Sequence, residues 1–119
     1  MNIEQLQHYC LLKKGVEETL PFGPDVLVYK VMGKMFLLCP LDTEGLQFNV
    51  KCDPDYAVEL REQYPTVIPG YHMSKKHWNT IIDDGSVPLK KLTEWIDHSY
   101  DLVVESLSKK TKELLLKNN

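Results

Sequence analysis

The residues whose types best suit chemistry are concentrated in positions 69–80, where lysine, histidine, asparagine and aromatic side chains follow one another closely. Lysine binds phosphate as a point charge, and asparagine can read adenine through one donor and one acceptor. Tyrosine and tryptophan can stack on an unpaired base. This composition indicates contact with nucleic acid, in which Lys75 and Lys76 would bind phosphate. His77 and Asn79 would then reach base edges.

The same stretch also fits a second interpretation, in which its rings belong to the core or to a surface for another kind of partner. Trp78 stands in an alternating segment, which favours a core position with Tyr71 covering it. A ring-lined cleft is also a typical site for a small ligand or a protein partner. Its residues would be Tyr71, His72, His77, Trp78 and the loop Pro21-Phe22-Gly23-Pro24. The residue types alone leave these interpretations open.

Catalytic and metal-binding chemistry finds little support in the residue spacing. His72 and His77 are five residues apart, so they do not share a helix face as a metal-binding pair would. The three cysteines, Cys10, Cys39 and Cys52, are widely spaced in apolar or amphipathic segments, which favours buried thiols over a zinc or redox site. Cys52 precedes a predicted helix, whose N-terminus would lower the pKa of its thiol and permit a pairing with His72 or His77. We expect no enzyme activity, no metal site and no cofactor.

Strands that must position these residues are predicted from composition and alternation. The segments 26–31 and 35–39 are rich in β-branched and aromatic residues, and Gly33 between them permits the tight turn of a hairpin. The segment 46–51 alternates strictly between apolar and polar residues, which predicts a half-buried strand. A fourth strand is predicted at 77–82, and shorter ones are expected near 16–20 and 67–73.

Capping residues mark the beginnings of three helices. Asn2, with Gln5 three residues further on, forms a capping box. Asp53 at the N-cap and Pro54 at the first helical position begin the second helix. Ser86 is expected to cap the long last helix, whose apolar residues follow the 3.6-residue period.

The apolar period of the last helix continues to Leu107, after which a break or a frayed continuation leads into a short terminal helix ending near Leu116. The predicted order of elements is therefore α-βββ-α-β-α. This order predicts an α+β fold, with one compact domain spanning residues 1–119 and helices packed on one face of an antiparallel sheet. A chain of this length buries roughly two thirds of its unfolded surface, which is enough for one core.

Charge is unevenly distributed along the chain. Fourteen Lys and Arg against seventeen Asp and Glu give a formal net charge of −3, which excludes a protein that coats DNA or an anionic membrane by bulk charge. Segments 26–39, 46–52 and 70–82 nevertheless contain no acid, and their lysines are Lys30, Lys34, Lys51, Lys75 and Lys76. The remainder has a charge of −8. Strands exclude Asp and Glu by propensity and lysine commonly protects sheet edges, so a purely structural origin stays open.

Signals that would direct or anchor the chain in a membrane are not visible in the sequence. No apolar run approaches the ~20 residues that span a bilayer. Residues 1–5 have neither the basic nor the apolar character of a secretory signal. We therefore expect a cytoplasmic protein without membrane contact, whose thiols stay reduced.

Motifs along nearly the whole chain resemble the MmcQ/YjbR family. They lie at 15–19, 21–24, 30–31, 33–36, 51–54, 60–61, 69–73, 76–80 and 98–103, and the longer ones include Pro69-Gly70-Tyr71-His72-Met73 and Lys76-His77-Trp78-Asn79-Thr80. The resemblance implies a CyaY-like α+β fold and DNA binding through a double-wing arrangement of hairpins. Position 108 is Ser where the family often has Pro, so the last helix is expected to run on further here.

Charge pattern and resemblance combine into one hypothesis about the molecule. A basic sheet face and the adjacent 70–79 loop lie against DNA, with the five lysines as sequence-independent phosphate contacts, in a monomer or weak homodimer. The DNA-binding hypothesis is supported if these lysines share one face of the fold, and it is weakened if they lie on different faces. The alternative is a non-catalytic module that binds a protein or a small ligand through residues 71–78.

Overall fold

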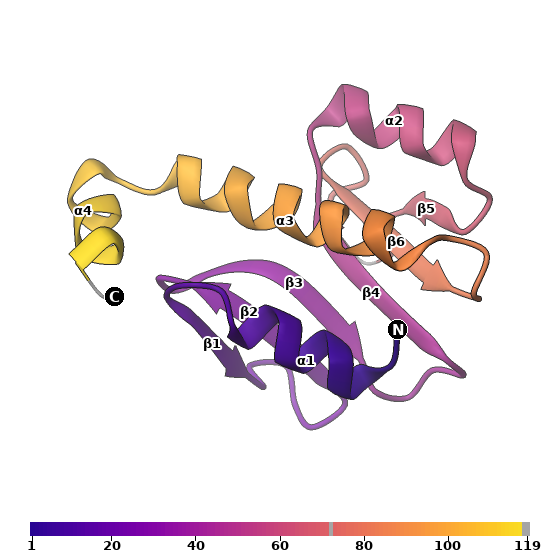
Figure 1. Ribbon diagram of the computed structural model, residues 1–119, viewed down its shortest axis with the longest axis horizontal. Helices are drawn as coiled ribbons and strands as arrows, with labels where there is room; N and C mark the ends of the chain where they lie inside the picture. Colours follow the sequence, from indigo (N-terminus) through magenta and orange to yellow (C-terminus); the bar gives the residue numbers. More distant parts are fainter. Residues whose placement is uncertain (72, 118–119) are drawn as a thin grey trace.

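A six-stranded antiparallel sheet organises the part of the chain that the computed structural model describes, residues 1–71 and 73–117 (Figure 1). The strands are β1 (Val16–Thr19), β2 (Val26–Val31), β3 (Lys34–Pro40), β4 (Leu46–Lys51), β5 (Val67–Pro69) and β6 (Trp78–Asp83). The helices are α1 (Ile3–Leu11), α2 (Pro54–Gln63), α3 (Leu89–Ser106) and α4 (Lys109–Lys117). The strands lie in the order β1-β2-β3-β4-β6-β5. The α+β class and the short strands predicted near 16–20 and 67–73 are confirmed.

The β2–β3 hairpin forms where the sequence predicts it. Met32 and Gly33 have positive φ angles of 49° and 85°, which is the combination that a two-residue type I′ turn requires. The register between the two strands shifts at Tyr29, so that Phe36 and Leu37 both reach the core. Such a β-bulge increases the local twist of the hairpin.

The predicted starts of the first two helices are confirmed. The side chain of Asn2 accepts a hydrogen bond from the Gln5 amide at 2.8 Å, and the Gln5 side chain accepts one from the Asn2 amide at 2.9 Å. Asp53 caps α2 by accepting a hydrogen bond from the Tyr56 amide at 3.2 Å. Each cap satisfies backbone donors that the first turn of a helix leaves without partners.

The last long helix begins and ends at different residues from those predicted. Ser86 does not cap it, because α3 begins three residues later without a side-chain cap and Ser86 lies in the preceding turn. At Leu107 the chain becomes extended. Ser108 then accepts a hydrogen bond from the Thr111 amide and begins α4. The expectation that Ser108 lets the last helix run on is therefore wrong, because this serine caps a new helix instead.

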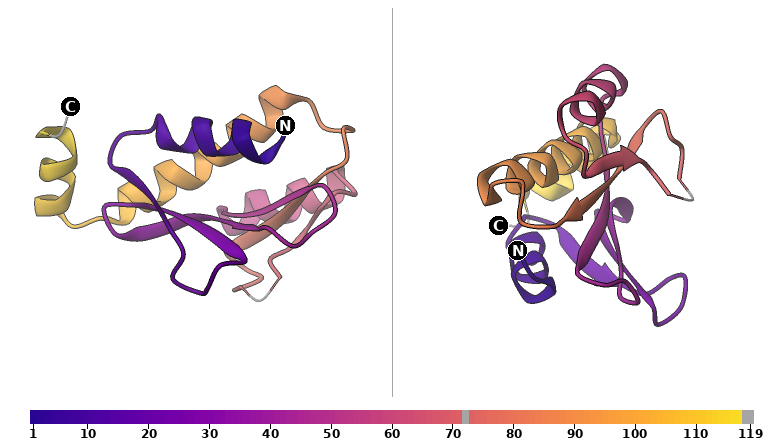
Figure 2. Two further views of the ribbon diagram at one scale, coloured as in Figure 1. Left: turned by 90° about the horizontal axis from the view of Figure 1, so that it is seen from below. Right: turned by 90° about the vertical axis from the view of Figure 1, so that its right-hand side faces the viewer.

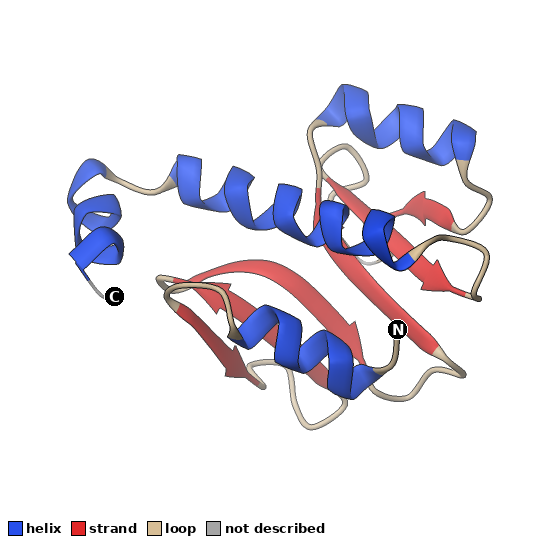
Figure 3. Ribbon diagram, in the orientation of Figure 1, coloured by secondary structure: helices blue, strands red, loops and turns tan. Residues whose placement is uncertain are grey.

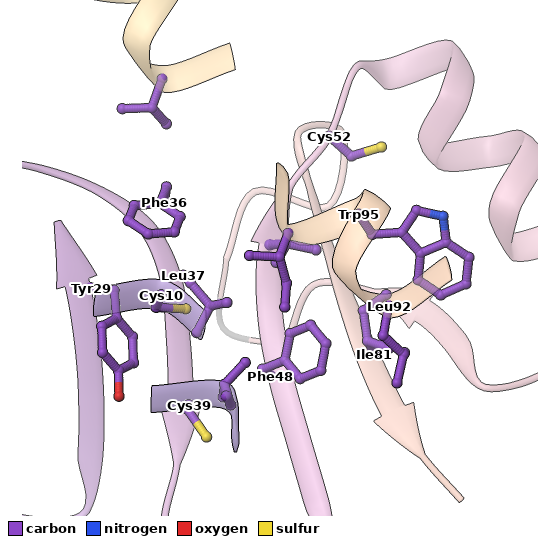
Figure 4. Packing of buried hydrophobic residues seen from close by; sticks show 14 of the residues in the cluster. Cys10, Tyr29, Phe36, Leu37, Cys39, Phe48, Cys52, Ile81, Leu92 and Trp95 are labelled. Atoms are coloured by element: carbon purple, nitrogen blue, oxygen red, sulfur yellow. The ribbon is translucent and has the colours of Figure 1, made fainter. Parts of the chain in front are cut away.

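The main core lies between the sheet and the helices α1 and α3, which cover the same face of the sheet (Figure 2; Figure 3). Its largest fully buried side chains include Trp95, Tyr29, Phe36 and Phe48 (Figure 4). Each such side chain contributes about 1.5–3 kcal/mol relative to an exposed position. The helix-covered face of the sheet is thus buried in the main core, whereas α1 and α3 leave the opposite face uncovered.

All three cysteines are free thiols buried in this core, which confirms the prediction of structural thiols. Burial raises the pKa of each thiol to about 12. For Cys52 the predicted direction is wrong, because desolvation outweighs the α2 N-terminus and the Asp53 carboxylate raises the pKa further. A thiol that stays protonated is a poor nucleophile, so Cys52 gives no support to Cys–His chemistry.

The opposite side of the sheet holds a second, smaller apolar cluster. Val28, Leu38 and Trp78 form it, with Met35 and Met73 among the side chains packed against it. Two connections, 20–25 and 70–77, project from this side, away from α1 and α3 (Figure 2). Among the described residues, no helix is both long and apolar enough to cross a membrane.

Candidate nucleic-acid interface

The sheet surface opposite α1 and α3, which we call the open face, presents every second residue of its central strands. Its apolar cluster fixes which residues these are, because Val28 pairs with Leu38 and Leu38 pairs with Asn49. In β4 and β6, Asn49 pairs with Thr80 and Lys51 with Trp78. Side chains directly opposite each other on paired strands share a face. The open face therefore combines apolar, amide, hydroxyl and ammonium groups.

Four of the five predicted phosphate-binding lysines belong to the open face or to a loop projecting from it. Lys30 lies two residues beyond Val28 on β2, and Lys51 lies two residues beyond Asn49 on β4, so alternation places both on this face. Lys75 and Lys76 are exposed in the 70–77 connection. None of the four takes part in an ion pair within the described chain. Their ammonium groups therefore make no direct ion pair with a described carboxylate.

Lys34 and Asn79, two residues of the predicted DNA-binding set, lie elsewhere. Lys34 donates to the Ser106 carbonyl at 3.4 Å, which places it on the helix side of the sheet. Asn79 is only 1% exposed; its amide donates to the Ala57 carbonyl and its oxygen accepts from Arg61. Asn79 is thus a structural residue and cannot read a base edge without unfolding its surroundings.

Of the two predicted histidines, only one can be placed. His77 is exposed, and its backbone carbonyl accepts a hydrogen bond from the Cys52 amide at 2.8 Å, which fixes the chain at the start of β6. His77 therefore stands at a fixed backbone position directly after Lys75 and Lys76. His72, part of the alternative ligand surface, lies outside the described residues.

Arg61, the one arginine of the chain, holds the 70–77 connection against α2. Its Nε donates to Asn79 Oδ1 at 2.7 Å, and its Nη2 donates to the carbonyls of Lys75 and Trp78. The guanidinium fork suits such a task because it presents several donors in a fixed geometry. The sequence marks this arginine only by its rarity; its three acceptors are separated from it by 14 to 18 residues.

Gly70 allows the same connection to lie tightly against β6. Its amide donates to the Trp78 carbonyl at 2.9 Å. A Cβ at position 70 would lie 2.8 Å from Trp78 Cβ and 2.9 Å from its oxygen, which is closer than packed atoms approach each other. The two anchors, Arg61 and Gly70, fix where Lys75 and Lys76 stand relative to the sheet.

A groove of about 490 Å³ lies on the open face between the two projecting connections. Residues that line it include Phe22, Leu38, Asp42, Asn49, Tyr71 and Met73. The rings of Phe22 and Tyr71 are 63% and 67% exposed, so both can contact a ligand. Trp78 is only 8% exposed, which confirms its predicted core position and removes it from the ligand-contacting surface.

A short hydrogen-bond chain connects the Tyr71 loop to the floor of the groove. The Tyr71 amide donates to Thr80 Oγ1 at 3.0 Å, and the Thr80 hydroxyl donates to Asn49 Oδ1. Asn49 is 7% exposed. Because its oxygen faces Thr80, the amide nitrogen of Asn49 is the group that can act as a donor toward the groove.

Acidic residues limit the basic surface on two sides. Asp42 lines the groove, and Glu17 is the cross-strand neighbour of Lys30. Of the lysines assigned to the open face, Lys51, Lys75 and Lys76 are therefore the ones that have neither of these two acidic residues as a cross-strand neighbour. Phosphate is favoured there and disfavoured beside Asp42.

The comparisons with known proteins agree on one family. A family model described as YjbR matches residues 11–102. The chain is 37% identical over 99 residues to YbdF of Escherichia coli O157:H7, covering 82% of this chain and 80% of the relative. It is 30% identical over 116 residues to YjbR of Escherichia coli strain K12, covering 98% of each.

Two solved structures are similar to this fold. The Deinococcus radiodurans protein DR2400, a DUF419 domain, superposes with a TM-score of 0.90 and 34% identity, covering 96% of this chain and 87% of that one. A Pseudomonas syringae protein superposes with a TM-score of 0.74 and 26% identity, covering 86% of this chain and 98% of that one. None of these names states a ligand or a reaction, so function is argued from the surface itself.

Proposed function

The chain belongs to the YjbR family, and on that premise and the geometry of its open face we propose that it is a DNA-binding protein. The observation that supports this proposal most is that Lys30, Lys51, Lys75 and Lys76 all belong to the open face or its loop. Ammonium groups without carboxylate partners can exchange counterions for DNA phosphates. Binding through them is independent of base sequence.

The distribution of acids supports the same orientation. Asp97 lies on α3, where it accepts hydrogen bonds from Tyr9 and Lys13 of α1 and its neighbourhood. This carboxylate belongs to the helix side of the molecule, away from the open face. Asp101 and Glu105 follow Asp97 on α3 at four-residue spacing, and both are exposed. DNA approaching that helix would meet acids, whereas DNA approaching the open face would meet lysines.

The affinity expected from four phosphate contacts is modest. Each contact contributes about −0.9 to the slope of log K against log salt, so the full set gives a slope of about −3 to −4. A slope of this size weakens binding roughly 150-fold between 50 and 200 mM salt. Measurements at low salt are therefore needed to detect the complex.

A pair of matched double variants tests the proposal. Lys75→Glu with Lys76→Glu reverses two charges on the open-face loop, and Lys109→Glu with Lys110→Glu reverses two exposed charges on α4. Fluorescence anisotropy with a labelled mixed-sequence DNA is expected to show an affinity lowered by roughly tenfold or more for the first variant only. Equal losses in both variants, or no loss in either, would contradict the proposed surface.

A second candidate function is the binding of a small apolar ligand or a protein segment, which the groove beside Phe22 and Tyr71 favours. Pockets of this kind are typically apolar with a few convergent polar groups. A thermal-shift screen separates the candidates. Stabilisation by small aromatic compounds, with no response to DNA at low salt, would favour this second function over the first.

A further inference from the structure

We infer that the groove on the open face receives an unpaired nucleobase, so that the form of DNA bound is single-stranded. This inference rests on the proposed DNA-binding function and adds to it the structural class of the ligand. Three independent features of the groove lead to it: its rings, its polar floor and the charges at its ends.

The rings come from two different loops. Phe22 belongs to the 20–25 connection and Tyr71 to the 70–77 connection, and both line the same groove over Leu38 of the sheet. Both side chains are more than half exposed, although large apolar groups are usually covered when they serve only the core. A flat base gains contact by stacking on such rings whatever its identity. The volume of about 490 Å³ lies within the range of small-ligand sites.

The polar groups of the groove match the edge of a base. Asn49 offers its amide nitrogen as a donor, because Thr80 holds its oxygen. Asp42 offers carboxylate oxygens as acceptors from the same groove. The edges of bases present ring nitrogens or carbonyls as acceptors beside amino or imino donors. A hydrocarbon ligand offers no hydrogen bond to Asn49 or Asp42, whereas a base edge carries both acceptors and donors.

The charges place the sugar–phosphate chain relative to that base. Lys51 lies two residues along β4 from Asn49, a distance of about 7 Å. Lys75 and Lys76 belong to the loop that also holds Tyr71. Phosphates flanking a base in the groove therefore meet ammonium groups on one side and are repelled by Asp42 on the other.

Duplex DNA cannot use this arrangement as it stands. Its bases are stacked and paired, so none can enter the groove unless it is first unstacked at a cost of a few kcal/mol. Phosphate contacts alone treat a duplex and a single strand alike apart from charge density. The ratio of the affinities for single-stranded and duplex DNA therefore tests the groove. The dependence of affinity on salt concentration tests the lysines.

The test compares one labelled single-stranded oligonucleotide with its own blunt duplex by anisotropy at low salt. The variants are Phe22→Ala with Tyr71→Ala, Tyr71→Phe, and a control, Leu89→Ala with Leu116→Ala, which removes two exposed apolar groups elsewhere. We expect the single strand to bind the unchanged protein more tightly than the duplex. The double ring variant should lose roughly 5- to 150-fold for each stacked base, while Tyr71→Phe and the control retain binding.

The possible results separate this inference from the proposed function. Equal binding of both DNA forms, with no effect of the ring variants and a clear effect of the Lys75→Glu and Lys76→Glu pair, would overturn the base-binding groove and leave DNA binding intact. If neither DNA form binds at low salt, both the base-binding groove and the proposed DNA-binding function are overturned. Because Phe22 and Tyr71 are exposed, thermal unfolding of the variants should match that of the unchanged protein, and this comparison excludes misfolding as the cause of a loss.

Discussion

Replacing Arg61 by methionine is expected to release the 70–77 connection and to destabilise the fold. The change removes the donors to Asn79 Oδ1 and to the carbonyls of Lys75 and Trp78. Asn79 is 1% exposed, so water does not replace the lost partner of its oxygen without structural change. Methionine retains an unbranched apolar stem, and the variant therefore tests the guanidinium group rather than the packing of the side chain.

The magnitude follows from the burial of the acceptors. Leaving the Asn79 oxygen unsatisfied costs about 1–3 kcal/mol, and loss of the two carbonyl contacts, one of them in an exposed part of the loop, adds about 1 kcal/mol. The sum of about 2–4 kcal/mol corresponds to a fall in Tm of about 8–16 °C for a domain of this size. The Tm of Arg61→Lys should lie between that of the unchanged protein and that of Arg61→Met, because one ammonium cannot reach three acceptors from a single position.

Thermal unfolding followed by circular dichroism measures the loss, and native-state hydrogen exchange locates it. Amides of Gly70, His77 and Trp78, which are hydrogen-bonded in this region, should exchange faster in Arg61→Met, while amides in the middle of α3 change only with global stability. A Tm within about 2 °C of the unchanged protein, with unaltered exchange at residues 70–78, would refute the anchoring role of Arg61.

Four further outcomes are expected. Gly70→Ala should lower Tm, because its Cβ would lie 2.8 Å from Trp78 Cβ; an unchanged melting curve would contradict that contact. The three cysteines, with pKa values near 12, should resist a thiol reagent at pH 8 until denaturant is added. The same thiols have a lower pKa in the unfolded chain than in the fold, so rising pH favours the unfolded state. The free energy of unfolding should therefore fall as pH rises from about 9 toward 12. Ser108→Ala should cost about 1 kcal/mol and speed exchange at the Thr111 amide; unaltered exchange there would argue against the cap.

Local features of the fold were predictable because their signals lie within a few residues. The capping box of Asn2 and Gln5 and the Asp53-Pro54 helix start each act within one turn of helix. The hairpin turn at Gly33 depends only on backbone conformation. These elements form where the sequence places them, since no distant contact opposes the local preference.

The failures have tertiary causes. Ser86 has the residue type of a helix cap, but a turn engages its amide before α3 begins. The thiol of Cys52 stands at a helix start that would lower its pKa, but burial, which is a property of the folded chain, raises it. Asn79 has the residue type of a base reader, yet Arg61 and Ala57 occupy both ends of its amide.

The candidate interface was predictable in part. Four of the five lysines in the acid-free segments belong to the open face or its loop. Lys34 could not be separated from them, because the bulge in the β2–β3 hairpin and the position of α3 decide which side of the sheet it reaches. Phe22 and Tyr71 line one groove, as the sequence predicts, whereas Asn49 reaches that groove only through the pairing of β3 with β4. The CyaY-like likeness and the double-wing arrangement stay predictions from the family resemblance.

The salt dependence of binding tests the central claim, DNA binding through the open face, most directly. Anisotropy titrations of the unchanged protein with labelled DNA between 50 and 200 mM salt should give a slope of log K against log salt of about −3 to −4. The Lys75→Glu and Lys76→Glu pair should reduce the magnitude of that slope by about 2. Absence of binding at the lowest salt, or binding whose slope is near zero, would contradict the account.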